Sequence, residues 1–369
     1  MALDTRPTPN PLPPTASGQA SPLPREREPD DRTSEIPNLR TAPGPLTDRF
    51  GRRHTYLRVS VTDRCNLRCQ YCMPAEGIEW TPRKDLLTYE EIVRIVRVLA
   101  GEGVEKVRIT GGEPTVRKDI ENLIAQVAAV PGIAEVAMTT NGTTLPKMAQ
   151  RYRDAGLTTL NVSIDSLQPE RFKQITRTDK MDTVLAGIES ALAAGFAPLK
   201  INVVSMKGVN DDETADFVAF AKDRPINVRF IEFMPFEGNE WSQGKMFSYR
   251  DMLDAVMQRF EIEPLPHRPS EVAKDFRIVG GVGTVSFITS MTEDFCSDCN
   301  RIRLTATGDF KPCLFMLPNV SVRDRIRAGG EDAAILDALR ESLAGKWEGH
   351  PGPQQLIRLK NASMIQIGG

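Results

Sequence analysis

Between residues 55 and 260 the chain alternates short β-rich runs with segments whose apolar residues recur about every 3.6 positions. Repeated βα units of this kind place their strands parallel, and several in sequence favour a closed or partly closed barrel. The six units predict an α/β fold, a partial (βα)6 barrel of the TIM type. A doubly wound open sheet is the alternative, because strand order cannot be inferred from one sequence. The expected strands are Tyr56–Thr62, Lys106–Thr110, Glu135–Thr139, Thr159–Ile164, Lys200–Ser205 and Asn227–Phe233.

The helices between these strands have recognisable starts. Thr88 and Glu91 have the spacing of a capping box, and Asp182 and Ser248 are candidate N-caps. After residue 260 we expect a further strand at Thr284–Thr289 and a charged helix around residues 331–345. The chain thus divides into a Pro-rich extension (1–45), a barrel (46–260) and a C-terminal region (261–369) that could cover the open side of the barrel.

The N-terminal 45 residues differ in composition from the rest. They hold 11 of the 27 prolines and almost no large apolar residues, so they cannot bury enough surface to offset the entropy of ordering and are predicted to be disordered. The whole chain of 369 residues has a net charge of -2 and no long apolar stretch. We therefore expect neither bulk nucleic-acid binding nor a membrane span. Unpaired thiols without a signal peptide predict a cytoplasmic protein.

The six cysteines fall into two groups of three. Cys65, Cys69 and Cys72 stand in T-D-R-C-N-L-R-C-Q-Y-C-M-P, directly after the first expected strand. A cubane iron–sulfur cluster has four irons, each normally held by one thiolate. Three thiolates on one loop therefore leave one iron open to bind a small molecule and pass it an electron. In parallel barrels reactive groups gather at the carboxyl ends of the strands, where this loop begins.

The second group has the same composition. Cys296 and Cys299 stand in C-S-D-C-N-R-I-R-L and Cys313 follows in D-F-K-P-C, again without a nearby fourth ligand. Disulfides suit small secreted domains, and a structural zinc site needs four ligands, whereas the three histidines lie away from the cysteine pairs. Zinc and inert buried thiols remain alternatives for each group taken alone. The two groups together predict two clusters.

A glycine-rich motif, T-G-G-E-P at residues 110–114, follows the second expected strand. Glycines let a backbone approach a ligand closely, and exposed peptide groups can hydrogen-bond an amino group. Together with the spacing of the first cysteine group and the aromatic Tyr71 before its last cysteine, this motif resembles the radical S-adenosylmethionine (SAM) superfamily. The resemblance implies that Cys65, Cys69 and Cys72 hold a [4Fe-4S] cluster whose open iron binds SAM.

Further motifs resemble the GTP 3',8-cyclase family of this superfamily, which acts in molybdenum cofactor biosynthesis. They are R-V-S-V-T-D-R-C, V-R-I-T-G-G-E-P, M-T-T-N-G, L-N-V-S-I-D-S-L, K-I-N-V-V and C-x-x-C-N-R-I-R-L with its third cysteine. The resemblance covers nearly everything from Leu46 to the C-terminus and omits the Pro-rich extension. Its most discriminating part is C-N-R-I-R at residues 299–303.

The resemblance also implies roles for single positions. Cys296, Cys299 and Cys313 would hold a second [4Fe-4S] cluster whose open iron faces the guanine, and a closing pair, Gly368 and Gly369, would reach back into the active site. Arg301 and Arg303 join the first cysteine group and this pair as catalytic residues. The implied SAM contacts are Tyr71, Gly112, Ser163 and Met234. The implied GTP contacts are Arg58, Arg108, Thr139, Lys200, Arg301, Ile302 and Arg303.

The cationic residue types agree with a triphosphate ligand. A triphosphate carries several negative charges, and a planar guanidinium can grip two oxygens at once. Arg58, Arg108 and Lys200 come from three expected strands, so a barrel would bring them to one pocket. Arg301 and Arg303 alternate on an extended segment and can point the same way. Any one of them, taken singly, is more typical of a solvated surface cation.

The resemblance finally implies a lyase reaction and its partners. An electron from the first cluster cleaves the SAM sulfonium, the 5'-deoxyadenosyl radical takes the ribose 3'-hydrogen of GTP, and the carbon radical closes onto guanine C8. The implied partners are an electron donor such as flavodoxin or ferredoxin and cyclic pyranopterin monophosphate synthase, which receives the product. The chain would be a monomer or homodimer. Two other classes stay open: a radical SAM enzyme acting on a peptide or another small molecule, and a non-enzymatic zinc-binding module.

Overall fold

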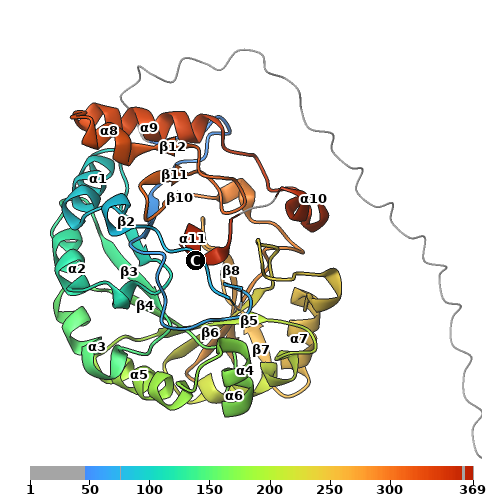
Figure 1. Cartoon of the computed structure of the whole chain (residues 1–369). Helices are drawn as coiled ribbons and strands as arrows, with labels where there is room; N and C mark the ends of the chain where they lie inside the picture. The colour runs from blue at the N-terminus through green and yellow to red at the C-terminus, as the bar shows by residue number, and fades with distance from the viewer. Residues whose placement is uncertain (1–45, 75, 360–361, 369) are drawn as a thin grey trace, which may run out of the picture. The chain divides into compact units, whose positions relative to one another are not determined.

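The computed structural model describes residues 46–74, 76–359 and 362–368, and the predicted disorder of residues 1–45 lies outside them. Six strands lie parallel and side by side in chain order (Figure 1). This order confirms the predicted partial barrel and excludes the doubly wound sheet, in which the strand order reverses. The strands are β1 (Tyr56–Ser60), β2 (Lys106–Thr110), β3 (Glu135–Thr140), β4 (Thr159–Ser163), β5 (Leu199–Ser205) and β6 (Ile226–Glu232).

Helices ring the outside of this sheet (Figure 1). Thr88 and Ser248 begin the first and last of them with capping boxes, as predicted. The prediction for Asp182 is wrong: Lys180 is the N-cap, and Asp182 lies in the first turn, where a carboxylate complements the helix dipole. The helices are α1 (Tyr89–Gly101), α2 (Ile120–Ala128), α3 (Leu145–Asp154), α4 (Pro169–Thr176), α5 (Met181–Ala193), α6 (Thr214–Lys222) and α7 (Tyr249–Met257).

The C-terminal region extends the sheet at both edges. β10 (Arg301–Leu304) pairs parallel with β1, and β9 (Thr284–Ile288) pairs parallel with β6, so one sheet runs through both sides of residue 260. The strand predicted at Thr284–Thr289 is therefore β9, and the helix predicted around residues 331–345 is α9 (Asp332–Ala344). The remaining elements of this region are β7 (Ile262–Pro264), β8 (Ala273–Ile278), β11 (Asp309–Lys311), β12 (Val320–Ser321), α8 (Val322–Arg327), α9 (Asp332–Ala344), α10 (Pro353–Arg358) and α11 (Met364–Ile367).

Short 3-10 helices lie in several loops, and some of them contain residues of the candidate site. α11, at the end of the described chain, lies inside the ring of strands rather than outside it (Figure 1). No helix in the described part of the chain is both long and apolar enough to cross a membrane. The 3-10 helices are η1 (Arg83–Asp85), η2 (Pro114–Val116), η3 (Asp211–Glu213), η4 (Gln243–Lys245) and η5 (Cys296–Asp298).

The two faces of the strands carry different chemistry. Leu57 and Val59 are fully buried in the main core, which also holds the apolar stripes of the surrounding helices. Arg58, between them, points to the opposite face, because successive strand residues alternate. The inward positions of the other strands are also polar. The barrel interior is therefore a cavity, unlike the layered apolar interior of a complete TIM barrel.

Candidate active site

A large cavity of about 820 Å³ occupies the barrel interior and its mouth. The strands contribute their inward side chains, and the loops at their carboxyl ends contribute the rest. Both cysteine groups line this cavity together with nearly all of the predicted contact residues. The predicted residues among its walls are Arg58, Cys65, Cys69, Tyr71, Cys72, Arg108, Gly112, Thr139, Ser163, Lys200, Met234, Cys296, Cys299, Arg301, Arg303 and Cys313.

All six cysteines are free and partly buried, so the disulfide alternative does not apply. Among the described residues, no three His, Cys, Asp or Glu side chains are grouped as ligands of one metal ion. The thiolates of a cubane cluster each bind a different iron, so they must surround a space instead of converging on one point. Two sets of three thiols around one cavity fit this requirement.

The first cysteine group lies in the loop after β1, where neutral groups donate hydrogen bonds to the sulfur of Cys65. Cys65 Sγ accepts hydrogen bonds from the Leu67 amide (3.4 Å) and from Asn141 Nδ2 (3.8 Å). Burial raises the pKa of Cys65 to about 11. Burial and the charges of neighbouring thiolates also raise the pKa of Cys69 and Cys72. These thiols therefore gain from a bound cation that stabilises the thiolate form.

The second cysteine group is set among cations. Lys346 Nζ donates a hydrogen bond to Cys299 Sγ (3.6 Å), and Arg52 Nη1 donates to the Cys296 carbonyl (2.7 Å). Burial opposes ionisation of Cys299, but the charges of Arg301 and Lys346 and hydrogen bonds from Arg301 outweigh it and lower the pKa of Cys299 to about 6. One thiol of this group is thus poised as a thiolate at neutral pH.

The T-G-G-E-P motif joins the ends of β2 and β3 to the first cysteine loop. A Cβ on Gly112 would lie 2.5 Å from the Arg64 carbonyl, so only glycine allows this approach of the two backbones. Glu113 is buried and accepts from Thr140 Oγ1 (2.7 Å) and from the Asn141 amide (2.6 Å). The close contact that Gly112 allows is therefore with the cysteine loop itself, just before Cys65, and the motif holds that loop in place.

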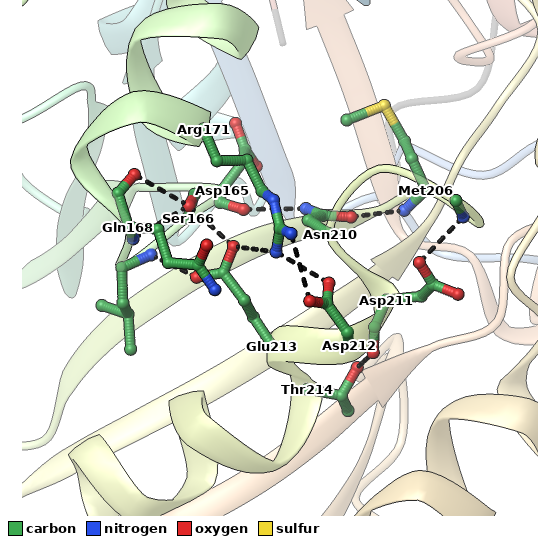
Figure 2. Close-up of polar contacts among 12 residues, drawn as sticks. Asp165, Ser166, Gln168, Arg171, Met206, Asn210, Asp211, Asp212, Glu213 and Thr214 are labelled. Carbon is green, nitrogen blue, oxygen red and sulfur yellow. Dashed lines mark hydrogen bonds and ion pairs between the residues drawn. The ribbon is translucent and has the colours of Figure 1, made fainter.

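A polar network holds the same loop from its other side. Tyr71 donates its hydroxyl to Asp165 Oδ2 (2.8 Å), and Asp165 Oδ1 accepts from the Val204 amide (2.8 Å). Figure 2 shows Asp165 beside Asn210, whose Nδ2 donates to the Asp165 carbonyl (2.8 Å). Burial raises the pKa of Asp165 to about 6, against the opposing effect of these hydrogen bonds. The ring of Tyr71 is thereby fixed among the cysteines.

Beyond Asp165 the network ends in an almost fully buried carboxylate, Glu213 (1% exposed). Glu213 accepts from Ser166 Oγ (2.7 Å), from the Leu167 amide (2.7 Å) and from Arg171 Nη1 (2.7 Å), as Figure 2 shows for the side chains. These bonds tie the loop after β4 to η3, after β5. Two loops at the carboxyl ends of neighbouring strands are thus locked together behind the cavity wall.

A ring of cationic side chains lines the part of the cavity that the strands enclose. Arg58 on β1 is in register with Arg108 on β2 and with Arg303 on β10. Burial and then the charge of Arg303 lower the pKa of Arg58, and burial followed by the charges of Arg229, Arg108 and Lys106 lowers the pKa of Lys200 to about 8. Like charges held this close favour an anionic ligand.

The cations of this ring differ in how many of their hydrogen-bond donors have partners within the protein. Arg108 donates from Nη1 to Asn161 Oδ1 (2.9 Å) and to Thr139 Oγ1 (3.2 Å), so two of the predicted GTP contacts bind each other. Nη1 of Arg303 is buried and has no hydrogen-bond partner within the described ranges. A buried unpaired guanidinium donor is costly, which makes Arg303 a ready donor to a bound anion.

The side chain of Ile302 does not face this cavity. It is fully buried in the main core, because it alternates with Arg301 and Arg303 on β10. The prediction that it contacts GTP is therefore corrected for the side chain, which packs on the helix side of the sheet. The pattern R-I-R contained this signal: two polar residues around an apolar one mark opposite faces.

The C-terminal tail returns to the ends of β1 and β2. Gly368 has a φ of 74°, and a Cβ on it would lie 2.7 Å from Cβ of Ser60 and 3.0 Å from Oγ1 of Thr110. Met364 and Ile365 of α11 line the cavity. Gly369, the other predicted tail residue, lies outside the described residues.

Several wall residues were not predicted. Arg229 on β6 and Lys106 on β2 extend the cation ring, and Tyr56 accepts from Arg108 Nε at the same level. A polar residue alternating with apolar neighbours in N-V-R-F was an available signal for Arg229. Asp165 lies within the motif L-N-V-S-I-D-S-L, but the motif did not indicate its hydrogen bond to Tyr71. Lys346, which contacts Cys299, had no signal, because its partners lie far away in the sequence.

Comparison with known proteins identifies relatives of both halves. Residues 59–221 match the family described as the radical SAM superfamily, and residues 226–351 match the family described as Molybdenum Cofactor Synthesis C. The chain is 50% identical to the mitochondrial GTP 3',8-cyclase of Arabidopsis thaliana, over 88% of this chain and 83% of that protein. It is 47% identical to the GTP 3',8-cyclase of Geobacter sulfurreducens, over 88% of this chain and 99% of that protein.

Other relatives are longer. The chain is 45% identical to molybdenum cofactor biosynthesis protein 1 of Mus musculus over 96% of this chain, and it spans 57% of that protein. Among solved structures, Streptococcus suis SuiB bound to precursor peptide SuiA has a TM-score of 0.56 at 17% identity, over 79% of this chain and 67% of SuiB. SuiB bound to S-adenosylmethionine has a TM-score of 0.51 at 19% identity, over 71% and 60% of the two chains. These structures share the fold.

Proposed function

The chain belongs to the GTP 3',8-cyclase family of the radical SAM superfamily, and we propose that it converts GTP to (8S)-3',8-cyclo-7,8-dihydroguanosine 5'-triphosphate, the first step of molybdenum cofactor biosynthesis. The observation that carries the proposal is the shared cavity: two groups of three thiols and a ring of cations open onto one space. That combination suits a nucleotide held between two metal centres.

The first cysteine group is proposed to hold the [4Fe-4S] cluster that membership of the superfamily implies, and the second group to hold another. When bound, the first cluster supplies SAM with the electron that breaks its sulfonium bond. The chain positions this chemistry: Glu113 and Asp165 fix the loop and Tyr71 from two sides. Tyr71, Gly112, Ser163 and Met234 are the proposed SAM contacts.

GTP is proposed to bind on the cation ring. Arg58, Arg108, Lys200 and Arg303 would neutralise the triphosphate, with Arg229 and Lys106 as additional cations from the same walls. Burying several like charges close together costs free energy, and a bound triphosphate would offset part of that cost. Arg301 and Arg303 lie on β10, which begins two residues after Cys299, and they would bridge the triphosphate and the second cysteine group.

The tail and the cavity walls are proposed to exclude water and to order the reacting atoms. α11 lies inside the barrel mouth (Figure 1), and Gly368 packs against the ends of β1 and β2. Radical chemistry needs positioning and solvent exclusion more than a general base. The electron donor, the enzyme that receives the product, a monomeric or dimeric assembly and a cytoplasmic location belong to this proposal as expectations of the family resemblance.

The test uses the full chain, purified without oxygen and reconstituted with iron and sulfide. About eight irons per chain are expected for two clusters. With SAM, reductant and GTP, the protein should form 5'-deoxyadenosine and the cyclised nucleotide, and omitting GTP should suppress the coupled product. Iron-loaded protein that cleaves SAM but leaves GTP unchanged would indicate another radical SAM activity. A colourless zinc protein would contradict both.

A further inference from the structure

Lys346, a charged residue outside the proposed catalytic set, contacts the sulfur atom of a proposed cluster ligand. Lys346 follows the end of α9 and is only 2% exposed. Its Nζ donates to Cys299 Sγ (3.6 Å) and to the Arg301 carbonyl (2.9 Å). Burying an ammonium group costs free energy unless it is paired, so the position calls for a compensating interaction.

The nearby acidic residue does not supply that interaction. Asp48 accepts from Arg52 Nε (2.7 Å) and lies 3.2 Å from His54 Nε2, so its carboxylate is already engaged by two other groups. Arg52 uses its remaining donors on the carbonyls of Cys296, Trp347 and Glu348. The negative groups that act most strongly on the ammonium group are the thiolate of Cys299, which it contacts, and then that of Cys313.

We propose that Lys346 raises the reduction potential of the second iron–sulfur cluster by placing a buried positive charge against the Cys299 thiolate. The inference rests on the second cluster proposed above. Reduction adds one negative charge to a cluster, and a cation nearby in a poorly solvated site stabilises the reduced form. Hydrogen bonds to cluster sulfurs act in the same direction. Lys346 is a positioning residue, since it acts through a ligand instead of touching the reacting nucleotide.

A purely structural role would give different results. Through the Arg301 carbonyl, Lys346 also holds the start of β10, and removing it could simply loosen the loop. That effect would appear as lost iron or lower thermal stability without a change in potential. A change in potential at full iron content is what a structural role would not produce.

The experiment compares the reconstituted full-length protein with K346M, K346R and K118M. K346M removes the charge while keeping an unbranched side chain, and K346R retains it. K118M removes a charge from a side chain that is 91% exposed and serves as the matched control. Redox titrations monitored by electron paramagnetic resonance give the reduction potential of each cluster. A variant with Cys65, Cys69 and Cys72 all changed to Ala identifies the signal of the second.

The expected result is a full iron content in all three variants and a lower potential of the second cluster in K346M alone. The one-electron equilibrium should shift at least tenfold, which corresponds to about 59 mV. The potential of the first cluster should stay unchanged. An unchanged second potential in iron-replete K346M, or loss of only the second cluster's iron in that variant, would overturn the inference. If the unmodified protein itself binds about four irons, the proposed second cluster fails instead.

Discussion

The two cysteine groups line the same cavity but differ in their electrostatic surroundings. Around the first group the donors to sulfur are neutral, namely the Leu67 amide and the Asn141 side chain. Around the second they are cationic, with Lys346 on Cys299 and Arg301 beside it. Contacts with the barrel strands and their loops hold the first cysteine loop. The second cysteine loop is held by Arg52, which precedes β1, and by Lys346, which follows α9.

This difference predicts a division of labour. The potential of an iron–sulfur cluster falls with negative charge and rises with hydrogen bonds to its sulfurs. Neutral donors to sulfur, together with the Asp165 carboxylate near Cys69 and Cys72, therefore favour a strongly reducing first cluster, which cleavage of a sulfonium needs. Cationic surroundings favour a second cluster that accepts an electron more readily. We expect substitutions in the two groups to fail in different ways.

The largest expected effect separates the two groups directly. Cys65→Ala should abolish SAM cleavage, because the first cluster loses one of three protein ligands. Cys299→Ala should retain some uncoupled cleavage but lose the cyclised nucleotide. Chromatography of 5'-deoxyadenosine and of the cyclised product measures both. If both variants lose SAM cleavage equally, the electrostatic difference between the two cysteine groups does not correspond to a difference in function.

The tail connects the two regions, so its removal is the next test. Deleting Gly368 and Gly369 should abolish cyclisation while leaving both clusters, because the backbone that packs on Ser60 and Thr110 is lost. G368A should act in the same direction, since an added Cβ would lie 2.7 Å from that of Ser60 and the φ of 74° disfavours alanine.

Iron content and the rate of 5'-deoxyadenosine formation serve as controls for the tail variants. Turnover equal to that of the unmodified protein would remove the tail from the mechanism.

A smaller effect is expected from Arg303, the cation whose Nη1 lacks a partner within the described ranges. Arg303→Ala should weaken GTP binding roughly 10- to 100-fold, the loss expected for a hydrogen bond to a charged group. Affinity for SAM should change little. Arg151→Ala, at a side chain that is 65% exposed, is the matched control. Calorimetry of nucleotide binding measures the effect, and equal affinities for GTP in both variants would exclude Arg303 from the triphosphate site.

The sequence predicted the barrel well because its signals are local. Alternating apolar periods placed the strands β1–β6 within one or two residues, and the capping box at Thr88 marked the start of α1. Short-range spacing also defined both cysteine groups. Asp182 was misplaced because its residue type favours the N-cap, whereas the backbone already becomes helical at Met181 and leaves Lys180 as the N-cap without a side-chain capping bond.

Other parts of the site could not be predicted, because they depend on contacts between distant segments. Lys346 meets Cys299 and Arg301 across more than forty positions, with separations of 47 and 45. Asp165 meets Tyr71 across 94. β9 and β10 join opposite edges of the sheet although they are neighbours in the chain. No residue pattern within a short window carries such information.

The smallest expected effect is the pH dependence of GTP affinity that arises from Lys200 on β5. Burial and neighbouring cations lower the pKa of Lys200 to about 8 in the free protein. A bound triphosphate favours the charged lysine and raises that pKa, so binding should take up a proton above pH 8 and GTP affinity should fall as the pH rises further. K200R keeps its charge throughout this range and should remove the dependence. Calorimetry at pH 8.5 in two buffers of different ionisation enthalpy counts the protons. An equal proton uptake in K200R would assign the titration to another group, since the guanidinium cannot supply it.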